Sequence, residues 1–321
     1  MKTAGRVAVF YHYFESNSDY RDNFIHFLST CYREDIDFYI SISDSNHTVE
    51  RLERPNIKYI LCENRNLDFG GFSASLATIA TLDAYDAFIF INCSVRGPFL
   101  PEYASDDWTS VFTRHLTGEV HLVGTGFSRV PEDSRLITHL SKGVYAPPYD
   151  TLQTTAYALS REALKHLIAV GFYETDATWT KDQVIALYEI RLSLEIRAQG
   201  WKIRCLLPTY GAGDGATLNL SARGGDPHQR RAFFSRTLSP LELIFVKTSR
   251  NMLSERELKS HTYTALLAHR RNGALPWAEG ERLFERLEQF IREDMEAYRA
   301  FRKGFVWKTF RNTPPFRHFF P

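Results

Sequence analysis

Cysteine and long apolar runs are scarce in this chain of 321 residues. Its four cysteines stand singly and form no C-x-x-C pair, which argues against a zinc knuckle or a disulfide framework and suits a reducing compartment. No stretch approaches the ~18–20 uninterrupted apolar residues of a membrane-spanning helix, and the first residues do not form a signal-peptide pattern. We therefore expect a soluble protein of the cytoplasm.

Net charge is also nearly absent, because 39 Lys and Arg residues are balanced by 38 Asp and Glu residues. A net charge of +1 excludes a protein that coats nucleic acid through bulk electrostatics, so we expect no nucleic-acid partner. Hydrophobic residues make up 44% and charged residues 24%, which excludes a disordered or collagen-like chain. What the chain has in excess is aromatic side chains, at 14%.

Strands and helices alternate in the hydrophobic pattern of the N-terminal part of the chain. The predicted strands cover residues 6–11, 36–42, 56–62 and 87–91, and the predicted helices cover residues 18–32 and 72–82. This alternation is typical of a Rossmann-type α/β fold, a mostly parallel sheet flanked by helices. Such sheets bind ligands at the carboxyl ends of their strands, so the loops that follow the strands are the first candidates for a site.

The second half of the chain is less regular. We expect strands at residues 120–123, 154–159 and 202–207 and helices at residues 161–170 and 181–199. Residues 211–225 carry five glycines and are predicted to form a loop that closes over a ligand. From residue 253 the pattern is helical and charged, which predicts a C-terminal helical extension over residues 251–321.

The loop after the third predicted strand, Glu63–Phe72, combines polar side chains with a pair of glycines. It opens a helix, where backbone N–H groups and the helix dipole favour an anion. Gly70 and Gly71 allow a ligand to approach the backbone closely. Asn66 and Asp68 can bind hydroxyl groups or the edge of a base. The alternative is an ordinary turn with a carboxylate at the start of the helix.

The loop after the fourth predicted strand reads Asn92-Cys93-Ser94-Val95-Arg96-Gly97-Pro98-Phe99. Arg96 offers a planar cationic fork to phosphate oxygens, and Asn92 and Ser94 supply neutral donors and acceptors. This combination suits a diphosphate. The plainer interpretation is a turn that ends a strand.

In their order and spacing, Asn66–Phe72 and Asn92–Phe99 resemble segments of bacterial polysaccharide glycosyltransferases with a GT-A-type fold. That group includes rhamnan-synthesis F-like proteins and transferases of lipopolysaccharide O-antigen or capsule. The resemblance continues at Thr154–Leu164, Tyr188–Ser193 and Leu238–Lys247 and covers residues 5–250. It implies a GT-A-like domain at residues 1–250, with a nucleotide-binding part at residues 5–125 and an acceptor and catalytic part at residues 126–250.

The resemblance also implies a UDP- or dTDP-sugar as donor, lying across the carboxyl ends of the strands. The donor contacts expected on this basis are Tyr11, Asn66, Asp68, Gly70, Gly71, Asn92, Ser94 and Arg96. The implied acceptor is a glycan or a lipid-linked glycan, with Thr154 and Thr155 among the substrate contacts.

In GT-A enzymes the triplet after the fourth strand is usually Asp-x-Asp and holds a divalent metal on the diphosphate. Here the triplet is Asn92-Cys93-Ser94, which offers no charged oxygen to a hard cation such as Mg²⁺ or Mn²⁺. We therefore favour transfer without a metal and predict no metal ligands. Weak binding of a metal through other ligands is the alternative.

An inverting transfer needs a base that deprotonates the acceptor hydroxyl, and Glu189 is the first candidate. On the predicted helix 181–199 it shares a face with Ile185 and Leu192. A carboxylate on an apolar face is costly unless it is paired or functional. Asp182 lies on the same stripe and is the second candidate. The structural alternative for Glu189 is an ion pair with an arginine.

Three residues outside these motifs are further candidates. Asp214, in the glycine-rich loop, is expected to contact sugar hydroxyls, and His228 is expected to reach the diphosphate, unless both are structural or solvent-exposed. Tyr11, at the end of the first strand, is expected beside the nucleotide. Its neighbour His12 is interpreted more readily as a core histidine.

After Glu296 the chain has six basic residues, eight aromatic residues and no acid. Aromatic rings beside cations suit an interfacial contact with anionic lipid. We therefore expect a peripheral contact with the inner face of the cytoplasmic membrane, which suits a lipid-linked acceptor. The alternative is a tail that packs against the protein or a neighbouring domain.

Two other functions compete with an enzyme that builds surface polysaccharide. The altered triplet also fits a non-catalytic module that holds a sugar nucleotide or a glycan inside a larger polymerase. A sugar-phosphate nucleotidyltransferase is disfavoured, because those enzymes have a Gly-rich, Arg-Lys-containing loop after the first strand. Here that loop reads His12-Tyr13-Phe14-Glu15-Ser16.

Overall fold

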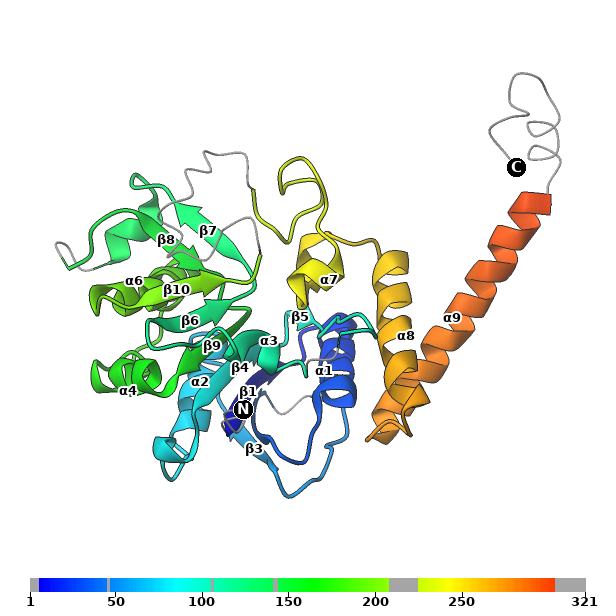
Figure 1. Ribbon diagram of the computed structural model, residues 1–321, viewed down its shortest axis with the longest axis horizontal. Helices are drawn as coiled ribbons and strands as arrows, with labels where there is room; N and C mark the ends of the chain where they lie inside the picture. The colour runs from blue at the N-terminus through cyan, green and yellow to red at the C-terminus, as the bar shows by residue number, and fades with distance from the viewer. Residues whose placement is uncertain (1–5, 45–46, 105–106, 141–143, 208–224, 304–321) are drawn as a thin grey trace.

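The structure is a computed structural model that describes residues 6–44, 47–104, 107–140, 144–207 and 225–303. Its centre is a seven-stranded sheet in the order β10-β6-β9-β4-β1-β2-β3 (Figure 1). All of its strands run parallel except β9, which is antiparallel to both of its neighbours. The strands are β1 (Val7–Phe14), β2 (Asp37–Ser43), β3 (Ile57–Cys62), β4 (Ala87–Asn92), β6 (Val120–Gly124), β9 (Ala156–Ser160) and β10 (Lys202–Cys205).

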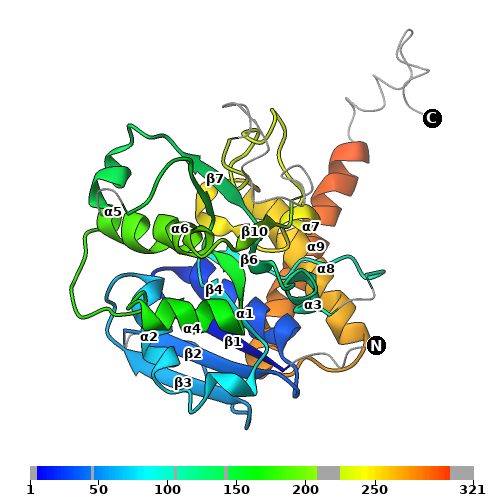
Figure 2. The ribbon, with the colours of Figure 1, turned by 60° about the vertical axis from the view of Figure 1, so that its left-hand side comes forward.

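Helices cover both faces of this sheet (Figure 1; Figure 2). Because successive side chains of a strand point to opposite faces, β1 contributes to two cores. Val9 and Tyr11 pack on the side of α1 and α9, whereas Ala8 and Phe10 pack on the side of α2, α4 and α6. The helices are α1 (Ser18–Cys31), α2 (Asp68–Leu76), α4 (Arg161–Ala169), α6 (Arg191–Ala198) and α9 (Ala278–Lys303). The predicted fold class, a mostly parallel sheet flanked by helices with a C-terminal helical extension, is confirmed.

Two helices differ from their predictions. α2 begins at Asp68, so the glycine pair lies inside the helix and not in the loop before it. The predicted helix 181–199 consists of α5 (Lys181–Val184), a π-helical turn (η3, Ile185–Ile190) and α6. A π turn inserts extra residues into the helical repeat, so spacing alone does not tell which residues before and after it share a face.

Two short ribbons were not predicted from the pattern. β5 (Val95–Arg96) pairs with β11 (Val246–Lys247), and β7 (Phe127–Val130) pairs with β8 (Tyr149–Leu152), both antiparallel. The β5–β11 ribbon places the segment after β11 beside the loop after β4. The remaining short elements are α3 (Ser110–Thr113), α7 (Pro240–Leu243), η1 (Leu82–Ala84), η2 (Arg135–His139) and η5 (Thr248–Arg250).

The C-terminal helices α8 (Glu255–Arg271) and α9 pack on α1 and complete the core on that face of the sheet. Leu266 of α8 and Phe284 of α9 are buried in the same cluster as Tyr11. Gly280 allows the close approach of α9, because a Cβ atom there would lie 2.2 Å from Oγ of Ser29. The extension therefore shares its core with the sheet.

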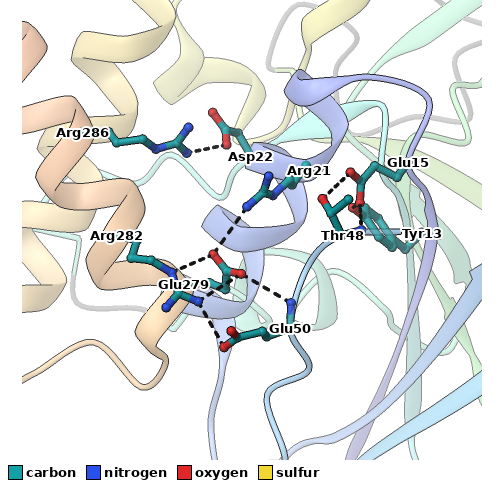
Figure 3. Close-up of polar contacts among 9 residues, drawn as sticks. All are labelled: Tyr13, Glu15, Arg21, Asp22, Thr48, Glu50, Glu279, Arg282 and Arg286. Carbon is teal, nitrogen blue, oxygen red and sulfur yellow. Dashed lines mark hydrogen bonds and ion pairs between the residues drawn. The ribbon is translucent and has the colours of Figure 1, made fainter. Parts of the chain in front are cut away.

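A polar cluster fastens the start of α9 (Figure 3). The buried carboxylate of Glu279 lies 3.1 Å from the guanidinium of Arg282 and 3.8 Å from that of Arg21 on α1. It also accepts a hydrogen bond from the backbone N–H of Glu50 at 3.4 Å. The far end of α9 projects away from the sheet (Figure 1). Among the described residues, no helix combines the length and apolarity needed to cross a bilayer.

Candidate functional site

A cavity of about 510 Å³ lies at the carboxyl ends of β1 and β4. The strand order reverses between these two strands, and open α/β sheets bind their ligands at this point. The lining comes from the ends of β1 and β4, the loop after β3, the residues before β9, the π turn and the segment after β11. Its residues are His12, Phe14, Tyr20, Asn64, Leu67, Asp68, Asn92, Cys93, Ser94, Thr154, Thr155, Lys181, Ile185, Glu189, Lys247, Ser249 and Arg250.

A larger cavity, of about 940 Å³, lies at the opposite, amino end of β1 and β4. Its charged side chains are already paired: Arg6 bonds to Asp37 at 2.6 Å, and Arg33 lies 3.0 Å from Asp107. The cavity at the carboxyl ends is the better candidate for a functional site, because it lies at the strand-order reversal; of its cations, Arg250 also lies 3.7 Å from Asp226. The sequence-predicted residues that line it are Asp68, Asn92, Ser94, Thr154, Thr155 and Glu189.

A hydrogen-bonded group connects the loop after β4 to the start of α2. Nδ2 of Asn92 donates to Oδ2 of Asp68 at 3.1 Å, and its Oδ1 accepts from Oγ of Ser94 at 2.6 Å. Burial raises the pKa of Asp68, while the Asn92 bond and Lys247 act in the opposite direction. Asn92 thus holds the Asp68 carboxyl in place at the edge of the cavity.

Glu189 lies on the π turn and lines the same cavity as Asp68, Asn92 and Ser94. Burial and the nearby carboxylate of Asp68 raise the pKa of Glu189 to about 7, against the opposing effect of Lys247, Lys181 and Arg250. Its carboxyl has no ion pair among the residues that the structure describes. A carboxyl with a pKa near neutrality can both accept and return a proton at physiological pH.

Three cations also line the cavity, and sequence reasoning missed all of them. Lys247 ends β11, Arg250 ends the turn η5 that follows, and Lys181 begins α5. They come from two separate parts of the chain, and no spacing in the sequence links those parts. Lys247 belongs to a segment of the resemblance, but nothing in the pattern singled out its side chain. Together they supply the positive charge that a diphosphate requires.

The back of the cavity is neutral. Burial lowers the pKa of His12 to about 4, so its ring is uncharged at neutral pH and bonds through Nδ1 to Oγ of Ser41 at 3.1 Å. Burial likewise raises the pKa of Cys93 to about 12, which keeps it a thiol. Oγ1 of the buried Thr155 has no hydrogen-bond partner among the described residues, so it is available to a bound ligand.

Arg96, predicted to bind the diphosphate, does not line the cavity. It is buried, and its Nε donates to Oδ1 of Asn23 at 2.7 Å. Its terminal nitrogens lie 3.4 Å from Oγ1 of Thr262 and 3.3 Å from the carbonyl oxygen of Asp19. The reason is the β5–β11 ribbon, which turns the residue into the interior. Arg96 is therefore not placed to bind a phosphate in this cavity directly.

Tyr11 and Asn66 also lie outside the lining. Tyr11 is a core residue that stacks on Phe27 at 4.5 Å, because it points to the α1 face of the sheet. Asn66 uses its whole amide on backbone: Nδ2 donates to the carbonyl of Ala177 at 2.7 Å, and Oδ1 accepts from the N–H of Trp179 at 2.8 Å. It fixes the segment that leads into α5.

The two glycines serve packing and do not serve ligand approach. A Cβ atom on Gly71 would lie 1.9 Å from Nδ1 of His12, and one on Gly70 would lie 1.9 Å from the carbonyl oxygen of Arg65. Both distances are far shorter than a van der Waals contact. Gly71 therefore lets α2 lie close against β1, and Gly70 lets it lie close to the loop at Arg65.

Of the remaining candidates, those that the structure describes lie outside the lining of the cavity. Asp182 does not line the cavity but pairs with Arg135 at 3.0 Å, because the π turn breaks the expected stripe. His228 is buried and accepts the backbone N–H of Lys247 at its Nδ1, so it supports a cavity residue without lining the cavity. Asp214 lies outside the described residues, as does the glycine-rich loop up to residue 224.

The triplet after β4 offers no carboxylate to a hard cation, although the carboxyls of Asp68 and Glu189 line the same cavity. The triplet Asn92-Cys93-Ser94 presents an amide, a thiol and a hydroxyl, and Oδ2 of Asp68 accepts a hydrogen bond from Asn92. No group of three or more His, Cys, Asp or Glu side chains that could hold a metal occurs in the described part of the chain. The cations that line the cavity are Lys181, Lys247 and Arg250.

No family model matches the chain, and none of the curated proteins matches it either. Similar solved structures include the mannosyltransferase PcManGT from Pyrobaculum calidifontis in complex with GDP-Man and Mn²⁺, with a TM-score of 0.42 and 11% identity over 99% of this chain and 84% of that one. The glycosyltransferase GlyE of Streptococcus pneumoniae has a TM-score of 0.37 and 13% identity over 91% of this chain and 64% of its own.

A third similar structure, 4-diphosphocytidyl-2C-methyl-D-erythritol synthase from Anaerococcus prevotii, has a TM-score of 0.34 and 13% identity over 56% of this chain and 81% of that one. At these values the comparisons do not identify a function.

Proposed function

We propose that the protein is a glycosyltransferase that moves a sugar from a nucleoside-diphosphate sugar to a hydroxyl of a glycan. One observation carries the proposal: a carboxyl with a pKa of about 7, Glu189, shares a cavity at the strand-order reversal with three cations. The motif resemblance of the sequence supports the same reaction class.

In this proposal Lys247, Arg250 and Lys181 bind the diphosphate and stabilise the negative charge that develops when it leaves. The donor then lies with its sugar toward Glu189. Asp68, Asn92 and Ser94 offer oxygen and nitrogen atoms to the hydroxyls of the donor.

The acceptor oxygen attacks C1 of the donor sugar while the bond between C1 and the diphosphate oxygen breaks. The acceptor proton passes to the carboxylate of Glu189, and the nucleoside diphosphate leaves with the bonding electron pair. Atoms and charge balance without a redox partner. We propose that the donor is a UDP- or dTDP-sugar, and that the cations of the chain act in place of a divalent metal.

The experiment is a thermal-shift screen with nucleoside diphosphates and their sugars, followed by turnover of every donor that binds. A rise in melting temperature with one base, and release of that nucleoside diphosphate when a glycan acceptor is added, support the enzyme. Binding without turnover for every donor and acceptor supports the non-catalytic module. No binding of any nucleotide contradicts both.

We also propose that the acceptor is a lipid-linked precursor of a bacterial surface polysaccharide, such as O-antigen or capsule, reached at the inner face of the cytoplasmic membrane. The support is the sequence after Glu296, with its cations and aromatic rings, and the exposure of Met295 and Tyr298 at the projecting end of α9. Sedimentation with vesicles of phosphatidylglycerol tests this. Equal binding by a chain that ends at Glu296 would contradict it.

A further inference from the structure

Asn23 of α1 is fully buried and bonds to two walls of the cavity. Its Nδ2 donates to the carbonyl oxygen of Cys93 at 2.9 Å and to Oγ1 of Thr248 at 3.1 Å. Cys93 belongs to the loop after β4, and Thr248 follows directly on Lys247. One side chain thus joins the triplet loop to the segment that carries two of the three cations.

Arg96 sets the orientation of this amide. Its Nε donates to Oδ1 of Asn23 at 2.7 Å. Because a guanidinium has donors and no acceptor, the oxygen of Asn23 has to face it, and the NH₂ group has to face Cys93 and Thr248. The direction of the amide therefore follows from hydrogen-bond chemistry and does not depend on packing alone.

Thr248 completes the connection. Its backbone N–H and its Oγ1 both donate to the carbonyl oxygen of Ser94, at 3.0 and 3.3 Å. The β5–β11 ladder, in which Val246 faces Arg96, holds the same two segments at the next residues. The segment Val246–Thr248, which leads into Arg250, is thus fastened to the triplet loop at consecutive residues.

The composition of this network is informative. Arg96 is buried, and no described carboxylate lies within ion-pair distance of it. A buried charge is an expensive way to stabilise a core, and apolar residues of similar size are often at least as stable. What the polar network adds is a single allowed geometry for the groups that it joins.

We propose that Asn23, oriented by Arg96, is a positioning residue that holds Lys247 and Arg250 where they bind the diphosphate of the donor. The inference deepens the proposed function and rests on it. Cations that are fixed before the ligand arrives bind it without a cost of reorganisation, so loosening the segment weakens diphosphate binding. Arg96 then affects the site indirectly, through Asn23.

The test uses the full chain and inorganic pyrophosphate, which probes the diphosphate subsite whatever the base. Two variants interrupt the network: Asn23→Asp and Thr248→Val. We expect pyrophosphate to bind roughly tenfold more weakly to each by calorimetry, a change of about 1.4 kcal/mol. The matched control is Thr30→Val, which removes a buried hydroxyl of α1 whose partner is the carbonyl of His26.

Thermal unfolding separates positioning from a merely structural role. Asn23→Asp keeps an acceptor for Arg96 but places a carboxylate oxygen against the carbonyl oxygen of Cys93, so a purely structural role predicts a lower melting temperature without a matching loss of binding. Positioning through Nδ2 predicts weaker pyrophosphate binding in both variants, and in Thr248→Val at a retained melting temperature. Thr248→Val introduces no charge, so it controls for repulsion between a new carboxylate and the anion.

Hydrogen exchange gives a readout that needs no ligand. The backbone amides of residues 247–250 should exchange faster in Thr248→Val than in the wild type, and at the wild-type rate in Thr30→Val. Unchanged pyrophosphate affinity in both network variants, with wild-type binding intact, overturns this inference and leaves the proposed function standing. Failure of the wild-type protein to bind pyrophosphate or any nucleoside diphosphate overturns both.

Discussion

At the scale of single residues, Glu189 sets the pH range in which the cavity can act. Its pKa is raised to about 7 by burial and by Asp68, so the carboxyl holds its proton below that pH and is ionised above it. A base has to be ionised to accept the acceptor proton. We therefore expect kcat/KM to fall about tenfold per pH unit below pH ~7 and to be flat above it. A profile that is flat down to pH 5 would contradict the assignment.

Lys247 allows a second prediction at this scale. Replacing it by Met keeps the length of the side chain and removes the charge from the cavity wall. Because hydrogen bonds to charged groups contribute about 1.5–3 kcal/mol, we expect affinity for a nucleoside diphosphate to fall roughly 10- to 100-fold by calorimetry. Lys165→Met, which removes a surface lysine paired with Asp83, should leave it unchanged. Similar affinities for both variants would exclude Lys247 as a ligand.

At the scale of elements, the close contact between α2 and β1 depends on Gly71. A methyl group there would lie 1.9 Å from the ring of His12, which is itself buried, so neither side can move freely. We expect Gly71→Ala to destabilise the protein by about 1–3 kcal/mol in denaturant unfolding, as overpacking of a core does. Gly118→Ala is the control, because a Cβ atom there meets nothing within 4 Å. Equal denaturation midpoints for Gly71→Ala and the wild type would show that α2 does not pack against His12 in this way.

The elements that carry the site were largely predictable from sequence, and the side chains only in part. Asp68 and Asn92 follow hydrophobic strands, and parallel strands bring their carboxyl ends to one edge, so their meeting could be expected. The buried position of Arg96 could not be predicted, because it depends on the pairing of β5 with β11, which lies far along the chain. The same pairing brings Lys247 into the cavity, so one unpredicted ribbon accounts for both errors.

Helical spacing failed at a different point. The α-helical repeat placed Asp182 and Glu189 on one stripe, but the π turn from Ile185 to Ile190 separates them. Pattern analysis assumes a constant repeat, and a π turn is a local departure from it that no residue type announces. Glu189 was predicted from its place on an apolar face; it lies within the π turn and lines the cavity together with Ile185.

At the scale of the whole molecule, the C-terminal helices depend on a buried carboxylate. Burial opposes ionisation of Glu279, but hydrogen bonds from Arg282 and from the N–H of Glu50, with the charges of Arg282 and Arg21, lower its pKa overall. A lowered carboxyl pKa contributes stability at neutral pH that is lost as the pH falls through the titration range. The attachment of α9 shown in Figure 3 should therefore weaken in acid.

Glu279→Gln tests this attachment. We expect the variant to lose about 1–3 kcal/mol of unfolding free energy at pH 7 and to approach the wild-type value near pH 3, where the native carboxyl is protonated as well. Glu285→Gln, at an exposed position of the same helix, should show no such difference. A loss for Glu279→Gln that stays constant from pH 7 to pH 3 would mean that shape, and not charge, fastens α9.

The central claim is that one cavity binds the donor and carries the base, and Glu189→Gln tests it most directly. The measurement is kcat with the donor found by the thermal-shift screen, together with the dissociation constant of its nucleoside diphosphate, for the variant and the wild type. We predict that turnover falls by about 10² or more, as expected for loss of a general base, while the dissociation constant stays within about twofold, under ~0.5 kcal/mol. Undiminished turnover would contradict the account.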